Sequence, residues 1–110
     1  MKKRILIIED DVAFGTMLKT WFSKNQWEPF LMSKVENAKQ ELLADKFDLV
    51  LSDLRLPDGD GIMLLEWMRE NNMLTPFIIM TSYSDVQTAV HAMKMGAFDY
   101  LSKPINPTIL

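Results

Sequence analysis

The stretch that decides the fold is residues 5–11, Ile-Leu-Ile-Ile-Glu-Asp-Asp, in which four apolar residues run directly into three carboxylates. A short continuous apolar run is typical of a strand that is buried on both faces of a sheet. Similar or weaker strand patterns recur at residues 27–32, 47–51, 77–80 and 98–101. Because Pro29 interrupts the pattern at 27–32, we expect that strand at an edge of the sheet.

Helical patterns separate these runs. In each segment the apolar residues repeat every three or four positions, which is the spacing of one buried helix face. The helical stripes cover residues 14–22, 35–42, 61–72 and 86–93. Ser33 and Glu36 have the spacing of a capping box, so we expect Ser33 to cap the second helix. Asn106-Pro107 has the pattern of a helix start, so we expect a fifth helix that has barely begun at Leu110.

The alternation of strands and helices predicts an α/β fold, a doubly wound parallel sheet of five strands with helices on both faces. In such sheets the functional crevice lies beyond the carboxyl ends of the strands. The polar residues that follow the expected strands are Glu9, Asp10, Asp11, Asp53, Thr81, Ser82 and Lys103. Carboxylates that share one rim raise the cost of each other's ionisation, and a divalent cation such as Mg²⁺ offsets that cost.

Other polar residues have simpler interpretations. We expect Asp11 to cap the helix that follows it. Residues 58–61, Asp-Gly-Asp-Gly, are typical of a turn rather than of a ligand set. His91 is the one histidine of the chain, and we expect it on the surface of the fourth helix.

Composition excludes several classes of function. The chain has 110 residues, 48% of them hydrophobic, and a formal net charge of −3, which suits one domain with an apolar core. It has no cysteine and one histidine, so disulfides, zinc–thiolate sites and multi-histidine metal sites are excluded. The mild acidity argues against direct binding of nucleic acid by this domain. No apolar run approaches the ~20 residues of a membrane span, and without an export signal we expect a cytoplasmic protein.

Four motifs together resemble the receiver domains of two-component response regulators. In chain order they are residues 5–11 (ILIIEDD), 52–61 (SDLRLPDGDG), 79–82 (IMTS) and 96–104 (GAFDYLSKP). The resemblance implies a flavodoxin-like sheet in the strand order 2-1-3-4-5. It also implies one receiver domain over residues 1–110 that lacks most of its last helix, with no output domain in this chain.

The resemblance implies a metal site. The residues that match the family's Mg²⁺ ligands are Glu9, Asp10, Asp53 and Arg55, the last through its backbone carbonyl. Carboxylate and carbonyl oxygens are the ligands that this hard cation prefers.

The resemblance also implies the chemistry. Asp53 matches the phosphoacceptor, Lys103 the lysine that pairs with the phosphoryl group, and Thr81 the switch hydroxyl. Tyr100 matches the aromatic residue that changes position on activation. The implied donor is a sensor histidine kinase or a phosphotransfer protein, and the implied result is control of an output domain, with transcription as the regulated process. Such a domain assists its own phosphorylation and dephosphorylation and is otherwise not an enzyme.

Three alternatives stay open. One is a receiver-like scaffold that works without phosphorylation, although the full set of Asp10, Asp53, Thr81 and Lys103 disfavours it. Another is a TOPRIM-type metal-dependent nuclease domain, which needs Asp-x-Asp where residues 53–55 read Asp-Leu-Arg. The third is a flavodoxin-type FMN carrier, in which the acidic residues 9–11 would repel the FMN phosphate.

A last expectation follows from the short fifth helix. Part of the first-helix stripe, with Met17, Leu18 and Trp21, should lose its cover. Apolar patches on this scale usually find a partner. We therefore expect this chain to self-associate, either as a two-fold homodimer that buries this face or with Ile109 and Leu110 exchanged between chains.

Overall fold

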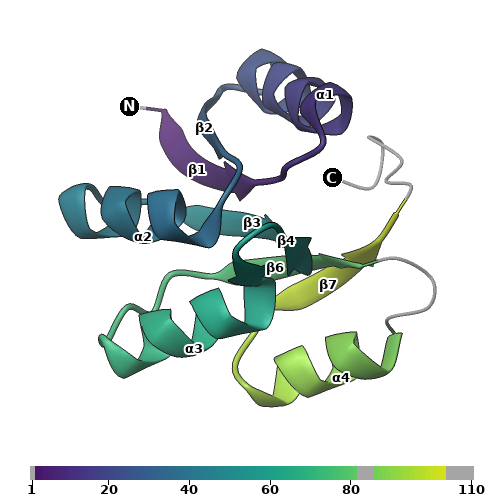
Figure 1. Cartoon of the computed structure of the whole chain (residues 1–110). Helices are drawn as coiled ribbons and strands as arrows, with labels where there is room; N and C mark the ends of the chain where they lie inside the picture. The colour runs from purple at the N-terminus through teal and green to yellow at the C-terminus, as the bar shows by residue number, and fades with distance from the viewer. Residues whose placement is uncertain (1, 82–85, 104–110) are drawn as a thin grey trace.

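A five-stranded parallel sheet forms the centre of the molecule (Figure 1). The computed structural model describes residues 2–81 and 86–103. The sheet consists, in spatial order, of β2 (Trp27–Met32), β1 (Lys3–Ile8), β3 (Leu49–Asp53), β6 (Phe77–Thr81) and β7 (Asp99–Ser102). Two short strands, β4 (Arg55–Leu56) and β5 (Gly59–Asp60), pair antiparallel in a separate hairpin. The five main strands thus confirm the expected flavodoxin-like order, with β2 and its Pro29 at one edge.

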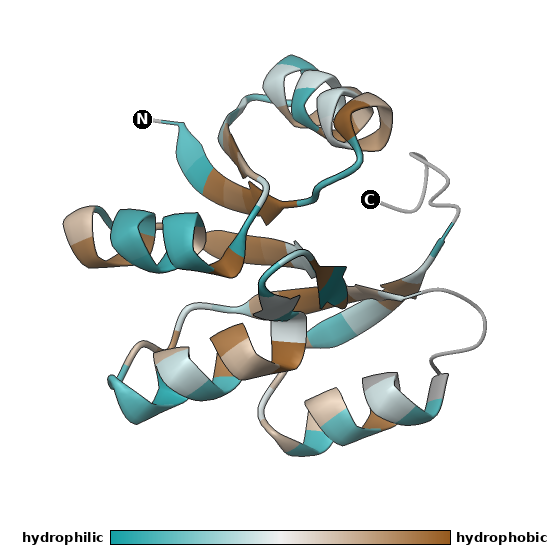
Figure 2. Ribbon diagram, viewed as in Figure 1, coloured by the Kyte–Doolittle hydropathy of each residue, from teal (hydrophilic) through white to brown (hydrophobic). Residues whose placement is uncertain are grey.

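Helices cover both faces of this sheet. They are α1 (Val12–Lys24), α2 (Val35–Ala44), α3 (Gly61–Glu70) and α4 (Val86–Lys94). In Figure 1, α1 lies on one face, and α2, α3 and α4 lie on the other. The apolar strands lie between these helix layers (Figure 2). Within β1, Ile5 and Ile7 belong to the core under α1, whereas Leu6 and Ile8 belong to the core under α2 and α3. None of the helices in the described part of the chain is long and apolar enough to cross a membrane.

The structure corrects several boundaries that the sequence predicts; the last strand, for example, covers Asp99–Ser102 rather than residues 98–101. β3 begins at Leu49 rather than at Phe47, because the carboxylate of Asp48, and not a backbone carbonyl, accepts the Arg4 N–H at 2.8 Å. The third helix ends at Glu70 rather than at residue 72. There Asn72 takes a left-handed conformation with φ 59°, which stops the helix.

The face of the sheet beside α1 carries an apolar hollow of about 190 Å³. Its walls include Trp21, Phe22, Trp27, Leu51, Ile78 and Leu101. Of the stripe that was expected to lose its cover, Leu18 is fully buried, whereas Met17 and Trp21 are partly exposed. The expected start of a fifth helix at residues 106–107 lies outside the described residues. Self-association through this face stays a prediction, which sedimentation at micromolar concentration checks.

Arg69, near the end of α3, ties together two loops. Its guanidinium donates to the carbonyl oxygens of Met73 at 2.7 Å and Thr75 at 3.1 Å, in the segment that leads to β6. It also donates to the carbonyl oxygen of Gly96 at 3.0 Å, in the turn after α4. Gly96 has φ 106°, a conformation that favours glycine. Burial lowers the pKa of Arg69, and its three carbonyl acceptors offset the cost of burying the cation.

The N-terminus of α2 is held by a residue from outside the helix. The residue before the helix is Lys34, whose side chain forms no capping hydrogen bond. Instead, the carboxylate of Asp58 accepts the backbone N–H groups of Val35 at 2.8 Å and Glu36 at 3.0 Å. These two bonds hold the pKa of Asp58 below its usual range, and the bond from Glu36 has the larger effect. The expectation that Ser33 caps this helix is therefore wrong, because the helix begins later and Asp58 supplies the acceptor.

Loss of the Asp58 carboxylate should destabilise the protein, whereas loss of the Ser33 hydroxyl should not. We expect Asp58→Ala to lower the melting temperature by several degrees, since two N–H groups of α2 lose their acceptor. Ser33→Ala, the matched control, should melt like the wild type. A depressed carboxyl pKa stabilises the fold only above the unfolded pKa, so the effect of Asp58→Ala should shrink as the pH falls below about 4. Thermal unfolding at several pH values measures this, and a larger effect of Ser33→Ala would contradict it.

Candidate functional site

Three carboxylates meet at the carboxyl end of the sheet. Glu9 and Asp10 follow β1, and Asp53 ends the neighbouring strand β3. One carboxylate oxygen from each residue lies within 4.8 Å of the others. Glu9 is only 2% exposed, Asp53 is half-buried and Asp10 is exposed. Oxygen ligands at this spacing could hold a hard divalent cation such as Mg²⁺.

Lys103 reaches this cluster from the far end of the described chain. Its Nζ lies 2.6 Å from Glu9 Oε1 and 2.9 Å from Asp53 Oδ2. Its backbone N–H donates to the carbonyl oxygen of Thr81 at 2.7 Å, which fixes the base of the side chain. The ammonium also lies 4.8 Å from the ring centroid of Phe14 on α1. A cation held at this position offsets the repulsion among the carboxylates.

The cluster changes the proton affinity of its members. Burial raises the pKa of Glu9 to about 7, and the hydrogen bond to Asp53 adds to that rise, while the bond to Lys103 opposes it. Burial lowers the pKa of Lys103, but the bonds to Glu9 and Asp53 raise it and prevail. Glu9 therefore binds a proton more readily than an ordinary glutamate does, and a bound cation would compete with that proton.

Thr81 carries an unused donor at the carboxyl end of β6. Its side chain is fully buried, and its Oγ1 has no hydrogen-bond partner among the residues that the structure describes. A buried hydroxyl without a partner is costly, so this group is available to an oxygen of a ligand at the site. Tyr100 lies on the adjacent strand β7, paired with Ile79, and packs partly buried against the core under α2, α3 and α4.

The hairpin β4–β5 directly follows Asp53 and begins with Arg55, whose side chain is exposed. Two backbone bonds hold the hairpin against the sheet. Leu54 N–H donates to the Met80 carbonyl at 3.0 Å, and Gly61 N–H donates to the Leu54 carbonyl at 2.9 Å. A Cβ on Gly61 would lie 2.7 Å from the carbonyl oxygen of Asp53, so only glycine fits here. The close approach fixes the backbone of the acidic residue.

Two turn residues of this hairpin cap helices, a role that the sequence pattern alone did not predict. Asp60 caps α3 by accepting the Met63 N–H at 2.8 Å, and Asp58 caps α2. The alternating Asp-Gly pattern was the available signal, because aspartates that alternate with glycines are frequent both at turns and at helix starts. The expectation that residues 58–61 form a turn agrees with the β4–β5 hairpin.

Comparison with known proteins identifies the family. A family model described as the response regulator receiver domain matches residues 5–110. The chain belongs to this family. Regulatory protein AtoC of Escherichia coli (strain K12) is 42% identical over 104 residues, which cover 94% of this chain and 22% of AtoC. Transcriptional regulatory protein ZraR of the same strain is 38% identical over 102 residues, which cover 93% of this chain and 23% of ZraR.

The fold is also similar to that of a solved receiver domain. The non-phosphorylated HemR receiver domain from Leptospira biflexa superposes with a TM-score of 0.90 and 30% identity, covering 98% of this chain and 87% of that one. The chain spans under a quarter of the length of the curated relatives that it matches. Because the chain belongs to the receiver family, it is neither a TOPRIM-type nuclease domain nor a flavodoxin-type FMN carrier, the two other folds that the sequence alone left open.

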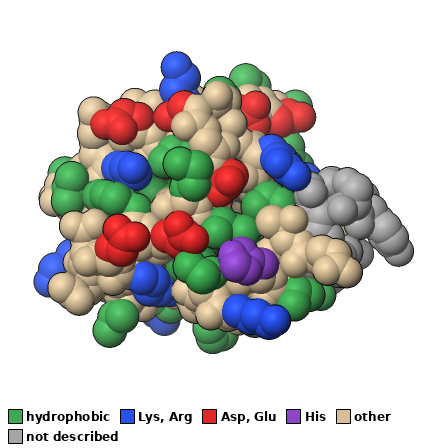
Figure 3. All heavy atoms as spheres, turned by 60° about the horizontal axis from the view of Figure 1, so that its bottom comes forward, with side chains coloured by type: hydrophobic (Ala, Val, Ile, Leu, Met, Phe, Trp, Pro, Cys, Tyr) green, Lys and Arg blue, Asp and Glu red, His purple; other side chains and the backbone are tan. Residues whose placement is uncertain are grey.

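The structure of this receiver domain brings most of the expected site residues together. Glu9, Asp10, Asp53 and Lys103 form one cluster, and Thr81 lies on the strand beside β3. Asp11 caps α1 as expected, accepting the Phe14 N–H at 3.0 Å. His91 is exposed on the surface of α4, as also expected (Figure 3).

The raised pKa of Glu9 predicts a pH dependence of stability in metal-free buffer. Folded Glu9 keeps its proton up to a pKa of about 7, whereas the unfolded chain releases it near pH ~4.3. The folded state then binds more protons, so stability should fall as the pH rises from about 5 to about 7.5. Glu9→Gln should flatten this slope and be more stable than the wild type above pH ~7, by about 1–3 kcal/mol.

Urea unfolding in EDTA at several pH values measures this effect. Asp10→Asn is the matched control, because it removes an exposed carboxylate of the same cluster and leaves Glu9 in place. It should keep the wild-type slope. Equal slopes for the wild type and Glu9→Gln would show that Glu9 ionises normally in the folded protein.

Proposed function

We propose that Asp53 accepts a phosphoryl group from a sensor histidine kinase or a phosphotransfer protein, in a reaction that depends on Mg²⁺. One observation carries this proposal. The ammonium of Lys103 lies 2.9 Å from Asp53 Oδ2, beside a group of three carboxylates that could hold a metal ion. A nucleophilic carboxylate and two sources of positive charge thus share one site, as phosphoryl transfer requires.

The chemistry is a displacement at phosphorus. A carboxylate oxygen of Asp53 forms the new O–P bond while the P–N bond to the donor histidine breaks, and the imidazole nitrogen keeps the electron pair of that bond. Lys103 lies where it can neutralise the phosphoryl oxygens as the group arrives. The carboxylates of Glu9, Asp10 and Asp53, with the backbone carbonyl of Arg55, would hold Mg²⁺. The bound ion supplies further positive charge to the same oxygens.

The proposed switch uses Thr81 and Tyr100. A phosphoryl group on Asp53 adds acceptor oxygens beside the unused hydroxyl of Thr81, which would move to donate to one of them. Space vacated by Thr81 would let Tyr100, on the adjacent strand, turn inward and change the surface near α4 and β7. We propose that this change controls an output domain. A transcriptional output is supported by the name of ZraR, and a cytoplasmic location follows because ATP-dependent kinases supply the phosphoryl group there.

Mass spectrometry tests the acceptor. After incubation with acetyl phosphate and Mg²⁺, the intact protein should carry one added phosphoryl group, which Asp53→Asn should abolish and EDTA should greatly reduce. Asp58→Asn, the control, changes a carboxylate outside the cluster and should be phosphorylated like the wild type. A protein that stays unmodified would support the scaffold alternative, and modification mapped to Asp58 or Asp60 would contradict the assignment.

The position of Lys103 predicts opposite effects on cation binding and on phosphorylation. Lys103→Met leaves the three carboxylates without their ammonium partner, so Mg²⁺ should bind several-fold more tightly. Phosphorylation should slow at least about tenfold, because the transferring group loses a nearby cation. Lys46→Met, which removes an exposed lysine outside the cluster, should change neither quantity. Calorimetric titration and the rate of mass gain measure the two effects, and weaker Mg²⁺ binding by Lys103→Met would contradict the proposed competition.

A further inference from the structure

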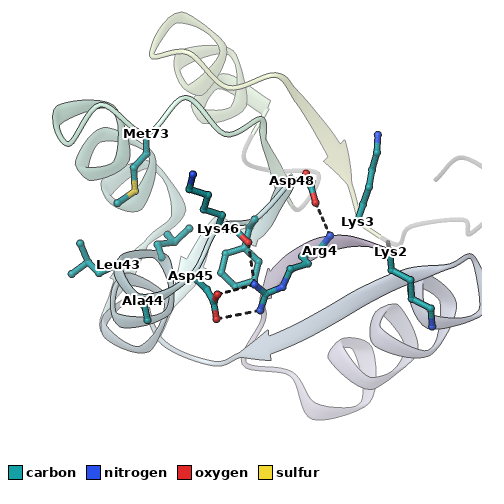
Figure 4. Close-up of a pocket in the computed structure, with 11 residues that line it drawn as sticks. Lys2, Lys3, Arg4, Leu43, Ala44, Asp45, Lys46, Asp48 and Met73 are labelled. Carbon is teal, nitrogen blue, oxygen red and sulfur yellow. Dashed lines mark hydrogen bonds and ion pairs between the residues drawn. The ribbon is translucent and has the colours of Figure 1, made fainter.

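A second charged hollow lies at the opposite end of the sheet from the acidic site (Figure 4). We call it the basal groove, and it is formed by residues 2–4, residues 42–48 and Met73. These segments come from the start of β1, the end of α2 with the link to β3, and the loop after α3. The hollow has a volume of about 840 Å³, which places it within the range of binding sites.

Both carboxylates of the basal groove are already paired within the protein. Asp45 Oδ1 lies 2.9 Å from Arg4 Nη1, and Asp48 Oδ2 accepts the backbone N–H of Arg4 at 2.8 Å. The guanidinium of Arg4 also lies 4.6 Å from the ring centroid of Phe30 and 5.1 Å from that of Phe47. The charges of Arg4 and Asp45 therefore offset each other, whereas Asp48 keeps its negative charge, because the backbone N–H that it accepts is neutral.

The lysines of the basal groove are not paired. The ammonium groups of Lys2, Lys3 and Lys46 form no ion pair or hydrogen bond with any residue in the described part of the chain, and all three residues are exposed. Four cationic and two acidic side chains line the groove, although the whole chain has a net charge of −3. Because charges more than about 10 Å apart are largely screened at moderate salt, a ligand in the groove experiences this local excess of positive charge.

One end of the basal groove is apolar. Leu43, at the end of α2, is 67% exposed, and Leu74, which directly follows Met73, is 82% exposed. In Figure 4, Leu43 and Met73 lie at one end of the groove, and Lys2 and Lys3 lie at the other. The groove therefore offers aliphatic side chains at one end and lysines at the other.

We propose that the basal groove docks an acidic amphipathic peptide segment of a partner protein. The carboxylates of that segment would contact Lys2, Lys3 and Lys46, and its aliphatic side chains would cover Leu43 and Met73. Charge complementarity favours this occupant, because four cationic side chains and only two acidic ones line the groove. A nucleic acid would use the lysines but leave the leucines exposed. A second copy of this chain, bound head to tail by its acidic end, would give open-ended assembly rather than a closed dimer.

Docking here would not compete with phosphorylation. β1 has six residues and separates the lysines at its start from Glu9 beyond its end, and a strand of this length spans about 20 Å. A partner bound in the basal groove therefore leaves Asp53 accessible to its donor. The proposal does not rest on the proposed function, since neither Asp53 nor Mg²⁺ takes part in it.

Fluorescence anisotropy with a defined probe tests the proposal. The probe is a labelled synthetic helix with Glu on one face and Leu on the other. We expect saturable binding that weakens as salt is added. Reversal of the three groove lysines (Lys2→Glu, Lys3→Glu and Lys46→Glu together) should weaken binding at least about tenfold, and Leu43→Ser should weaken it several-fold. The matched control reverses three exposed lysines elsewhere, Lys19, Lys24 and Lys94, and should bind the probe nearly as well as the wild type.

Further measurements test the other possible occupants of the groove, which are a nucleic acid and a second copy of this chain. Amide chemical-shift changes on titration should map to residues 2–4, 42–48 and 73–75. Asp53→Asn should bind the probe like the wild type, and the groove triple variant should still gain a phosphoryl group from acetyl phosphate. Absence of saturable binding, equal loss in the control triple variant, or equal affinity for a probe with Ser in place of Leu would overturn the proposal. So would equal competition by a DNA duplex, or sedimentation showing that the groove lysines hold copies of this chain together.

Discussion

The ammonium of Lys103, held between the carboxylates of Glu9 and Asp53, is the interaction on which the functional end of this receiver domain depends. The parallel sheet brings three acidic residues to one edge, and their mutual repulsion is a direct cost of that topology. Lys103 offsets the cost through contacts of 2.6 Å and 2.9 Å. Its backbone bond to Thr81 makes the same residue a link between β6 and the acidic cluster. Lys103 thus connects the charge balance of the acidic site to the position of β7, the last described strand.

The hairpin after β3 connects this cluster to the helices. Asp58 holds the start of α2 and Asp60 holds the start of α3, while Gly61 packs against the carbonyl oxygen of Asp53. A change in the backbone at Asp53 would therefore be felt at the N-termini of two helices. Both carboxylates lie outside the cation cluster, so they hold the starts of the two helices rather than bind the ion.

Much of this structure could be predicted from local patterns. The apolar runs that lead to Glu9, Asp53 and Thr81 located β1, β3 and β6. They also located the acidic rim, because parallel strands place their carboxyl ends together. The β4–β5 hairpin could not be predicted in this way, because two-residue strands contain no periodicity. The cap that Asp58 provides was also hidden. It acts on a residue 23 positions away in the chain, whereas capping signals in a sequence are local. The buried hydroxyl of Thr81, which has no partner among the described residues, depends on packing that only the folded chain defines.

The hydrogen bonds of Arg69 have a mechanical consequence. They join the last turn of α3 to the carbonyl of Gly96 just after α4, so the C-terminal end of α4 is anchored to its neighbour. A helix that is anchored at its C-terminal end responds to a lateral displacement by rotating about that end rather than by translating. Any displacement of α4 would then be largest at its N-terminal end and smallest near Gly96. A short movement at the carboxyl edge of the sheet would then tilt the whole of α4 about the hydrogen bond between Arg69 and Gly96.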